Sequence, residues 1–467
     1  MKKPMLNFCL VMLACNSVKG VTFLNDYVDS TNKVSLAAGF IPDSSRIIVG
    51  EPLFLTFVAS NQTDKPFQFC RVNTEIFSFS ATNAAGVPVK QSFSHRMDGN
   101  GFLSKVTVEP HKAFTERLFL NSWFEFNEPG DYMVTCRCKF DRCFTQTNSF
   151  ESFNQPIITV FKMTVQPSDP KRVTEIISYW SKVVETNGDI GEAAQALSEF
   201  NDSQIIPPLT ALVEKDANNY FAVNALARFT NDAAMDALAI VLKSGEGYEA
   251  GVAKAAIVKA NQADRIAKLF LPKLLNTNAQ IRIQNARAIS WTGSKLAFTP
   301  LCSLLNDETN IVRYAAAEAI GRLNNLHSFE VLTNCLTNSD FTLRIAAIKG
   351  LIAMGKTVQL EWVKPMILSG SENIRWWYDS MDLLRMHGGD QAGPELASCL
   401  HFDDPSVRNS YNMRLILAFS FIPSGTNYFY RWHCDPNRDG TAQELAENRQ
   451  ILSELKSWLD KQKQIFY

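Results

Sequence analysis

The chain has 467 residues, of which 46% are hydrophobic, and its formal net charge at pH 7 is −1. This length predicts about three domains, and the hydrophobic content excludes an intrinsically disordered chain. Basic residues are scattered and balanced by acidic ones, so no electrostatic footprint for nucleic acid is visible. We therefore expect a multidomain globular protein without a nucleic-acid partner.

Residues 1–20 have the pattern of a signal peptide. Lys2 and Lys3 precede a short apolar run, Met5–Ala14. This arrangement predicts export to a bacterial periplasm, cell surface or exterior. Residues 12–15 also resemble a loose bacterial lipobox, so a lipoprotein anchored to the membrane through Cys15 is the alternative. No later segment has the roughly 20 apolar residues that a membrane-spanning helix needs.

Residues 21–168 carry the two-residue period of β-strands. Leu53, Leu55, Phe57 and Ala59 are apolar at every second position, and turn-forming residues follow at 61–66. Further strands are expected at 76–82, 103–108, 114–120, 132–140 and 157–165. Six or seven short strands with such turns predict an antiparallel β-sandwich.

Two segments in this region, Gly50-Glu51-Pro52 and Glu128-Pro-Gly-Asp-Tyr132, each precede a predicted strand. In these motifs the region resembles bacterial immunoglobulin-like domains. The resemblance implies an immunoglobulin-like sandwich of about 130 residues. It departs from antibody domains in one respect, because Tyr132 lies four residues before Cys136 instead of two.

The same region contains Cys70, Cys136, Cys138 and Cys143. Cys136 and Cys138 share one face of a predicted strand, so their thiols point the same way. An even number of cysteines in an exported domain favours disulfides. We prefer the pairs Cys138–Cys143 and Cys70–Cys136, with a four-cysteine zinc site as the alternative.

Residues 169–422 are predicted to be helical and repetitive. Five aliphatic–arginine pairs place their arginines 31, 31, 31 and 33 residues apart, at Arg282, Arg313, Arg344, Arg375 and Arg408. A helix N-cap residue stands four positions before each arginine: Asn278, Thr309, Asp340, Ser371 and Asp404. Eleven positions after the first three arginines come Gly293, Asn324 and Gly355, which suit the left-handed turn beyond a helix end. Each unit is a helical pair that buries its apolar face only by stacking, which predicts an α-solenoid.

These units resemble HEAT repeats, and in particular the short type named after phycobilin-lyase proteins. The resemblance rests on the cap, the aliphatic–arginine pair and the small residues after it, as in the segment 340–347, and it is strong over 278–355. It implies an armadillo-like, two-layer superhelix whose second helices line the concave face. A repeat of this kind is a scaffold, so the resemblance does not imply lyase activity. We expect the repeat arginines themselves to be structural, bonding carboxylates and carbonyls of the adjacent repeat.

The helical projection also predicts a partner-binding strip. Residues two, five and nine positions after a repeat arginine lie opposite the core-facing side of each second helix. Seven such residues are candidates: Arg287, Trp291, Glu318, Arg322, Lys349, Trp377 and Leu384. Tryptophan and arginine often dominate binding energy, so we expect these side chains to contact a protein partner. The alternative is that Trp291 and Trp377 pack between helices.

Residues 423–467 comprise an aromatic and polar loop and a capping helix from about 442 to 464. Four residues of the loop match calcium-ligand positions of an EF-hand: Asp435, Asn437, Asp439 and Thr441. The twelfth position, where a bidentate glutamate belongs, is Ala446, so a polar turn that caps the last helix is the alternative. We therefore expect no cofactor, with calcium as the alternative at this loop.

Residues 350–357 match the P-loop expression letter for letter. A phosphate cradle needs free backbone amides in a loop between a strand and a helix. Here the repeat places 350–353 inside a helix that begins after Asp340, with Gly355 as its stop. We therefore expect no nucleotide to bind.

The sequence contains none of the local motifs of metalloproteases or α/β-hydrolases, so we do not expect an enzyme. The predicted function is noncatalytic protein–protein interaction or scaffolding in the cell envelope or outside the cell. An unknown protein would bind on the concave face of the solenoid. The alternatives are a hydrolase or lyase with a site at the domain junction, and calcium-dependent carbohydrate or surface adhesion.

Overall fold

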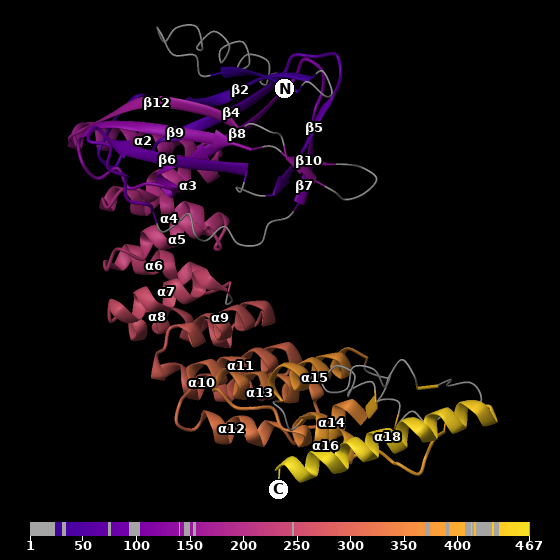
Figure 1. The fold of residues 1–467 in the computed structure, drawn as a ribbon. Helices are drawn as coiled ribbons and strands as arrows, with labels where there is room; N and C mark the ends of the chain where they lie inside the picture. The colour runs from indigo at the N-terminus through magenta and orange to yellow at the C-terminus, as the bar shows by residue number, and fades with distance from the viewer. Residues whose placement is uncertain are drawn as a thin grey trace. The chain divides into compact units, whose positions relative to one another are not determined.

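The computed structural model describes residues 24–29, 34–72, 76–92, 103–139, 141–143, 150–152, 156–244, 247–368, 374–388, 392–406, 412, 415–416, 432–433 and 439–466. Strands come first in the chain and helices follow (Figure 1). The contacts divide the chain into two compact units, Met1–Ala225 and Leu226–Tyr467. Among the described helices, none combines the length and the apolar character required to cross a membrane.

The first unit holds the described strands and the helices up to α5. Its strands are β1 Leu24–Asp29, β2 Val34–Pro42, β3 Arg46–Ile48, β4 Phe54–Asn61, β5 Phe67–Val72, β6 Phe77–Asn83, β7 Leu103–Val108, β8 Ala113–Phe119, β9 Gly130–Cys138, β10 Asp141–Cys143, β11 Phe150–Ser152 and β12 Ile157–Gln166. They form three four-stranded sheets in the orders β1-β2-β4-β8, β11-β10-β5-β7 and β3-β12-β9-β6. The pairing is antiparallel except between β3 and β12. The five strand segments predicted after residue 61 are all present as strands.

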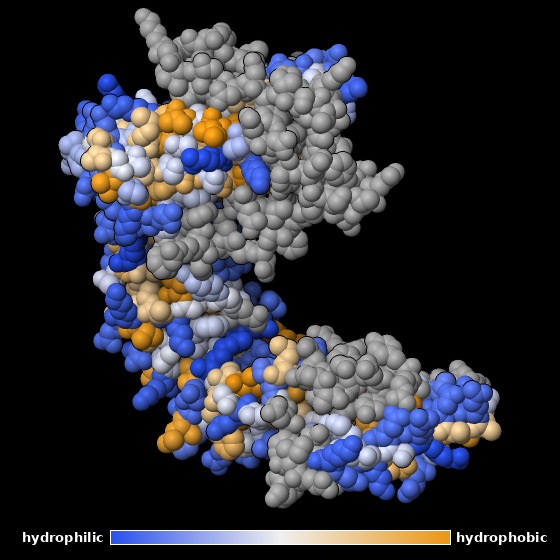
Figure 2. All heavy atoms as spheres, in the orientation of Figure 1, coloured by the Kyte–Doolittle hydropathy of each residue, from blue (hydrophilic) through white to orange (hydrophobic). Residues whose placement is uncertain are grey.

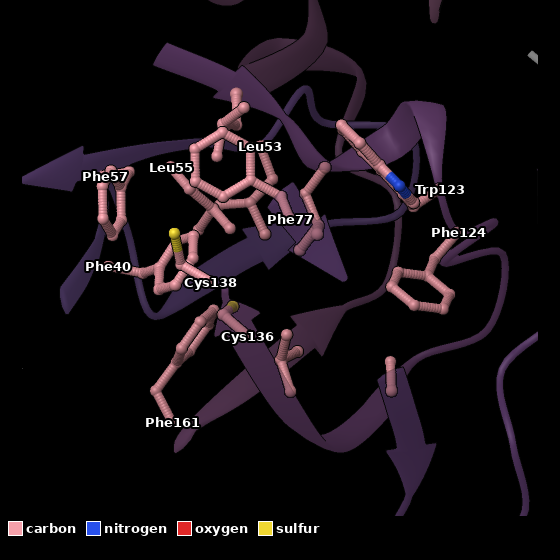
Figure 3. Close-up of a cluster of buried hydrophobic side chains, with 14 of the residues drawn as sticks. Phe40, Leu53, Leu55, Phe57, Phe77, Trp123, Phe124, Cys136, Cys138 and Phe161 are labelled. Atoms are coloured by element: carbon pink, nitrogen blue, oxygen red, sulfur yellow. The ribbon is translucent and has the colours of Figure 1, made fainter. Parts of the chain in front are cut away.

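One apolar cluster joins side chains from all three sheets, including Phe40, Phe57, Phe69 and Phe161 (Figure 3). Burying this much aromatic surface supplies the main driving force for folding the region. Beside the cluster, the Tyr132 hydroxyl donates a hydrogen bond of 2.7 Å to the carbonyl of Glu128, in the turn that leads into β9.

Strand β4 is buried on both faces. Leu53, Leu55 and Phe57 belong to the main cluster, and Phe54 points to the other side, where it joins Phe119. Trp180 of α2 packs against this second pair of rings, with 5.6 Å between the Phe54 and Trp180 ring centroids. The two-residue alternation of the sequence therefore predicts which face of β4 lies in the main core. It does not predict that the opposite face is also buried.

The outer face of the β9–β12 pair carries exposed apolar side chains. Met133, Ile158 and Val160 are each at least 40% exposed. Hydrophobic residues accordingly colour the surface over these two strands in Figure 2. The neighbouring Lys162–Asp131 ion pair, at 2.8 Å, keeps this face of the sheet partly polar.

The helices continue from the first unit into the second. Those before the repeats are α2 Pro170–Glu185, α3 Ile190–Ser198, α4 Ile206–Lys215, α5 Tyr220–Leu226, α6 Asp232–Val241, α7 Tyr248–Lys259 and α8 Ala263–Phe270. Those from the first repeat arginine onward are α9 Ala279–Trp291, α10 Phe298–Leu304, α11 Asn310–Leu323, α12 Ser328–Cys335, α13 Phe341–Ala353, α14 Leu360–Leu368, α15 Ile374–His387, α16 Ala392–Ser398 and α18 Ala442–Phe466. Within the described part of the predicted repeat region, the helices therefore come in pairs.

The predicted helix caps and stops fall where the sequence placed them. The side chain of Asn278 accepts a hydrogen bond from the Gln280 amide, and Asp340 accepts one from the Thr342 amide. Thr309 is the N-cap of α11 without a side-chain bond. The stops Gly293, Asn324 and Gly355 have φ of 75°, 48° and 77°, the left-handed conformation. Ser371 lies outside the described residues.

Helices α11 and α13 approach each other unusually closely. A Cβ atom on Gly321 would lie 2.2 Å from the Cα of Gly350, and one on Gly350 would lie 2.9 Å from the carbonyl oxygen of Ala317. Only glycine fits at this crossing, and the alanines nearby keep the helices in contact along their length. Gly350 thus lies inside α13, as the helical interpretation of residues 350–353 predicts.

The last helix packs on the end of the repeat region. Leu452, Leu455 and Leu459 are buried in a cluster with residues of α14, α15 and α16, and Leu445 is half-buried. At its N-terminus, the Thr441 hydroxyl accepts from the Glu444 amide at 3.2 Å. The Glu444 carboxylate accepts from the Thr441 amide at 2.8 Å. This reciprocal pair is a capping box.

Candidate functional site

The second helices of successive repeats place five of the predicted strip residues together. Arg287 on α9, Glu318 on α11 and Lys349 on α13 each lie five positions after their repeat arginine, and Trp291 and Arg322 lie nine positions after theirs. Because α9, α11 and α13 pack side by side, equal positions on the three helices are neighbours. We call these five residues the Trp291 strip.

Charge alternates along one row of the Trp291 strip, from Arg287 through Glu318 to Lys349. The Lys349 ammonium donates a hydrogen bond of 2.7 Å to the Tyr314 hydroxyl and lies 5.4 Å from the centre of that ring. Burial by itself lowers the pKa of Lys349, but this bond and the nearby Glu318 and Asp379 raise it on balance. Lys349 is therefore held charged and in a fixed position at the α13 end of the strip.

Two cations lie against the ring of Trp291. The Lys254 ammonium, on α7, is 5.8 Å from the ring centroid, and the Arg322 guanidinium is 5.6 Å from it. Arg322 also lies 3.9 Å from the Glu318 carboxylate, four residues earlier on the same helix. The negative face of an indole attracts cations at such distances, so the three side chains hold one another in place.

The strip is half-buried. Glu318 is 9% exposed, whereas Arg287, Trp291, Arg322 and Lys349 are all of intermediate exposure. The alternative that Trp291 packs between helices therefore holds in part, because its ring is partly covered and still reaches the surface. What the arrangement offers chemically is an aromatic face edged by fixed cations, with no nucleophile or paired acid and base among these residues.

Two further residues of the predicted strip are not placed with the others. Leu384 is 2% exposed, in the core formed with α14, α16 and α18, so the prediction that it contacts a partner is wrong. The projection of a single helix does not reveal this cluster, because its members come from several helices. The side chain of Trp377 lies outside the described residues.

The projection missed two members of this surface, Lys254 and Tyr314. Tyr314 directly follows the repeat arginine Arg313, a position that the chosen offsets left out. Lys254 lies 33 residues before Arg287, close to the repeat length, on a helix that carries no repeat arginine. Extending the period one unit towards the N-terminus would have found it.

The first two repeat arginines bond the adjacent repeat as predicted, Arg344 bonds carbonyls of its own repeat, and the side chains of Arg375 and Arg408 lie outside the described residues. Arg282 donates to the Asn276 carbonyl of its own repeat at 2.8 Å and to the Asp307 carboxylate of the next repeat at 2.8 Å. Arg313 repeats the pattern one unit later, with the Asp307 carbonyl at 2.8 Å and the Asp340 carboxylate at 2.6 Å. These bonds link neighbouring repeats and leave the arginines no role at the opposite surface.

The predicted calcium loop lies only partly within the described residues. Asp435 and Asn437 fall outside them, and Asp439 is exposed. Thr441 forms the capping box of α18, the alternative function that the sequence suggested for this turn. Within the described ranges no group of three or more histidine, cysteine or acidic side chains is arranged to hold a metal ion.

In the structure Cys136 and Cys138 are free thiols and do not form the predicted disulfides. Both sulfurs point into the aromatic core of the first unit, on the shared strand face that the sequence predicts (Figure 3). Burial raises the pKa of Cys136 to about 12 and that of Cys138 well above its ordinary value. The side chains of Cys70 and Cys143 lie outside the described residues.

The fold and the inter-repeat contacts define a HEAT-like helical repeat region in this chain. Residues 298–382 match the family model described as HEAT repeats, a family that generally mediates protein–protein interaction or scaffolding. Crystal structures of two engineered proteins are also similar, each 17% identical. The match to the first spans 53% of this chain and 97% of the engineered chain, with a TM-score of 0.22. The match to the second spans 60% of this chain and 67% of the engineered chain, with a TM-score of 0.21. Because these TM-scores are low, the assignment of the repeats rests on the family match. No curated protein gave a significant match.

Proposed function

We propose that this protein is a noncatalytic interaction or scaffolding protein that binds another protein through the Trp291 strip, on the concave side of its repeats. The observation that carries the proposal is the Trp291 ring held between Lys254 and Arg322 and still partly exposed. Tryptophan and arginine in such surroundings are the residues that most often dominate binding energy. The side chains are also held before binding, which reduces the entropy lost on association.

The experiment starts with capture of partners by the mature chain and their identification by mass spectrometry. Affinity for the captured partner is then measured by calorimetry for Trp291→Ala and for a matched control, Phe329→Ala. Phe329 is 44% exposed and has Lys356 over its ring, but it lies on α12, in the other helix layer. We expect Trp291→Ala to lose more than about 1 kcal/mol of binding and the control to lose little. Unchanged affinity with a lower melting temperature would make Trp291 a core residue and contradict the proposal.

We further propose that the protein is exported and that its three sheets form an immunoglobulin-like sandwich. The signal-like pattern of Lys2, Lys3 and the run Met5–Ala14 supports export. The Tyr132 hydroxyl bond to the backbone upstream supports the sandwich, since immunoglobulin-like domains use a tyrosine in this way. Intact-mass measurement of native protein should show the loss of about 15–20 residues. A diacylglycerol on Cys15 would select the anchored form, and an unprocessed Met1 would contradict export.

A further inference from the structure

The Trp291 end of the strip has an excess of positive charge. Lys254 and Arg322 lie over the ring, and Arg287 lies four residues before Trp291 on α9. The acid at this end is Glu318, whose carboxylate is 3.9 Å from Arg322. The charges are three positive and one negative, so their sum is +2. At the other end Lys349 also interacts with Asp379, and with Glu318 already counted these two charges cancel. The strip is therefore polarised, although the whole chain has a net charge of only −1.

The cations at this end are fixed at a partly desolvated surface. The Nε atom of Arg287 is buried and makes no hydrogen bond to any described residue. Lys254 and Arg322 are held against the indole ring, so little side-chain entropy remains to be lost when an anion binds. Next to them, Val258 is 51% exposed and lies beside Gly293, two residues after Trp291. An apolar contact is thus available next to the cations.

Resting on the proposed function, we propose that the strip recognises an acidic peptide segment of its partner. Carboxylates of the segment bind between Lys254 and Arg322, and an apolar side chain of the segment packs on Trp291 and Val258. A guanidinium donates hydrogen bonds in a plane and suits a carboxylate better than a neutral amide. A basic segment would face a net repulsion at this end of the strip.

The test uses the full chain and three fluorescein-labelled synthetic peptides. In the first, glutamates alternate with glycine and serine around a single leucine; in the others, each glutamate is replaced by glutamine or by lysine. Fluorescence anisotropy should show binding of the glutamate peptide and at least about tenfold weaker binding of the lysine peptide. Raising the ionic strength from about 0.05 M to about 0.3 M should reduce the affinity for the glutamate peptide, because salt screens partly exposed charges.

Variants assign the effect to the proposed residues. Arg322→Gln and Lys254→Gln should each reduce the affinity for the glutamate peptide about threefold to tenfold. Lys295→Gln changes an exposed lysine outside the strip and should leave the affinity for the glutamate peptide unchanged. The double variant Lys254→Glu with Arg322→Glu should prefer the lysine peptide. Circular dichroism of each variant confirms that the repeats are folded, and Lys254→Gln keeps the test decisive if Arg322→Gln is unstable.

Equal binding of the glutamate and lysine peptides, no binding of either, or no effect of both single variants would overturn the inference. So would a concentration-dependent dimer that Arg322→Gln abolishes, because the occupant would then be a second copy of this chain. The proposed function fails separately, when Trp291→Ala leaves the affinity for the captured partner unchanged. If a captured partner needs Trp291 but is not displaced by the glutamate peptide, the proposed function stands. The inference that the partner binds through an acidic segment is then contradicted.

Discussion

At the scale of single residues, the contact between Gly321 and Gly350 sets the distance between α11 and α13. The same crossing brings Tyr314 and Glu318 of α11 close to Lys349 of α13, so the glycines act on the Trp291 strip without belonging to it. A glycine inside a helix is otherwise unfavourable, because it loses more backbone entropy on folding than alanine does.

Gly321→Ala should therefore destabilise the protein by about 1–3 kcal/mol or more, since the added Cβ would lie 2.2 Å from backbone that cannot move alone. The matched control is Gly251→Ala, inside α7, where an added Cβ meets nothing within 4 Å. That variant should gain about 0.5–1 kcal/mol. Urea unfolding followed by circular dichroism measures both, and equal effects would show that the close crossing does not exist.

Cys136 and Cys138 give a second test at this scale. Burial raises the pKa of Cys136 to about 12, so almost no thiolate is present near pH 8 and access is blocked as well. Iodoacetamide should leave both thiols unmodified in the native protein and label both after unfolding without a reductant. If labelling requires a reductant as well as unfolding, the disulfides predicted from the sequence exist in the native protein.

At the scale of elements, the pairs Arg282–Asp307 and Arg313–Asp340 join the first three repeats. Burial would raise the pKa of Asp307, but hydrogen bonds from Arg282 and the Thr309 amide lower it on balance. The pKa of Asp340 is likewise lowered by Arg313 despite burial. A folded-state pKa below the unfolded value stabilises the protein above the unfolded pKa, and this stability is lost as the pH falls through the folded value.

Asp307→Asn and Asp340→Asn should therefore reduce the free energy of unfolding at pH 7 and reduce it much less at about pH 3. The ordinary pKa of an aspartate is 3.8, so the loss in the unmodified protein should begin near that pH and deepen below it. The control is Glu330→Gln, at an exposed acid on α12. Urea titrations at both pH values measure the difference, and a pH-independent loss would mean that the pairs are not the cause.

The capping box gives a prediction for the last helix. Thr441→Ala removes the hydroxyl that accepts from the Glu444 amide and should cost about 1 kcal/mol. Thr441→Ser keeps the hydroxyl and should cost little. Hydrogen exchange of the first turn of α18 measures the local effect. If Thr441→Ala instead abolishes a calcium-dependent rise in melting temperature, Thr441 serves an ion rather than the helix.

At the scale of the whole molecule, the first helices belong to the compact unit of the sheets. Arg117 on β8 bonds the Asp43 carboxylate at 2.6 Å and the Glu192 carboxylate of α3 at 3.0 Å. Arg172 of α2 bonds Glu51 at 2.8 Å. These contacts, with Trp180 packed on Phe54, join α2 and α3 to the sheets within the first compact unit, Met1–Ala225.

Trp180→Ala should destabilise the sheets and α2–α3 together by about 2–3 kcal/mol. This is less than the usual loss on truncating a fully buried aromatic residue, because Trp180 is only partly buried. Hydrogen exchange should show faster exchange in β4, β8, α2 and α3 and no change in α11 and α13. The adjacent Tyr179 is 62% exposed, so Tyr179→Ala is the control and should have little effect. Faster exchange in α2 and α3 alone would indicate that the sheets fold independently of them.

The sequence alone determined what depends on neighbours within a few positions. The caps Asn278 and Asp340, the stops Gly293 and Asn324, and the shared face of Cys136 and Cys138 follow from local hydrogen bonds and backbone geometry. The period of the arginines also fixed which positions of neighbouring helices lie together, because a solenoid repeats its contacts.

Only the tertiary structure decided what covers each face. Leu384 occupies the same position in its repeat as Trp291, yet it is buried in a cluster with residues of α14, α16 and α18. Lys254 joins Trp291 from a helix without a repeat arginine, and Trp180 covers the second face of β4. Such contacts join residues far apart in the chain, and the burial that stabilises them depends on every packed element at once, which no local pattern contains.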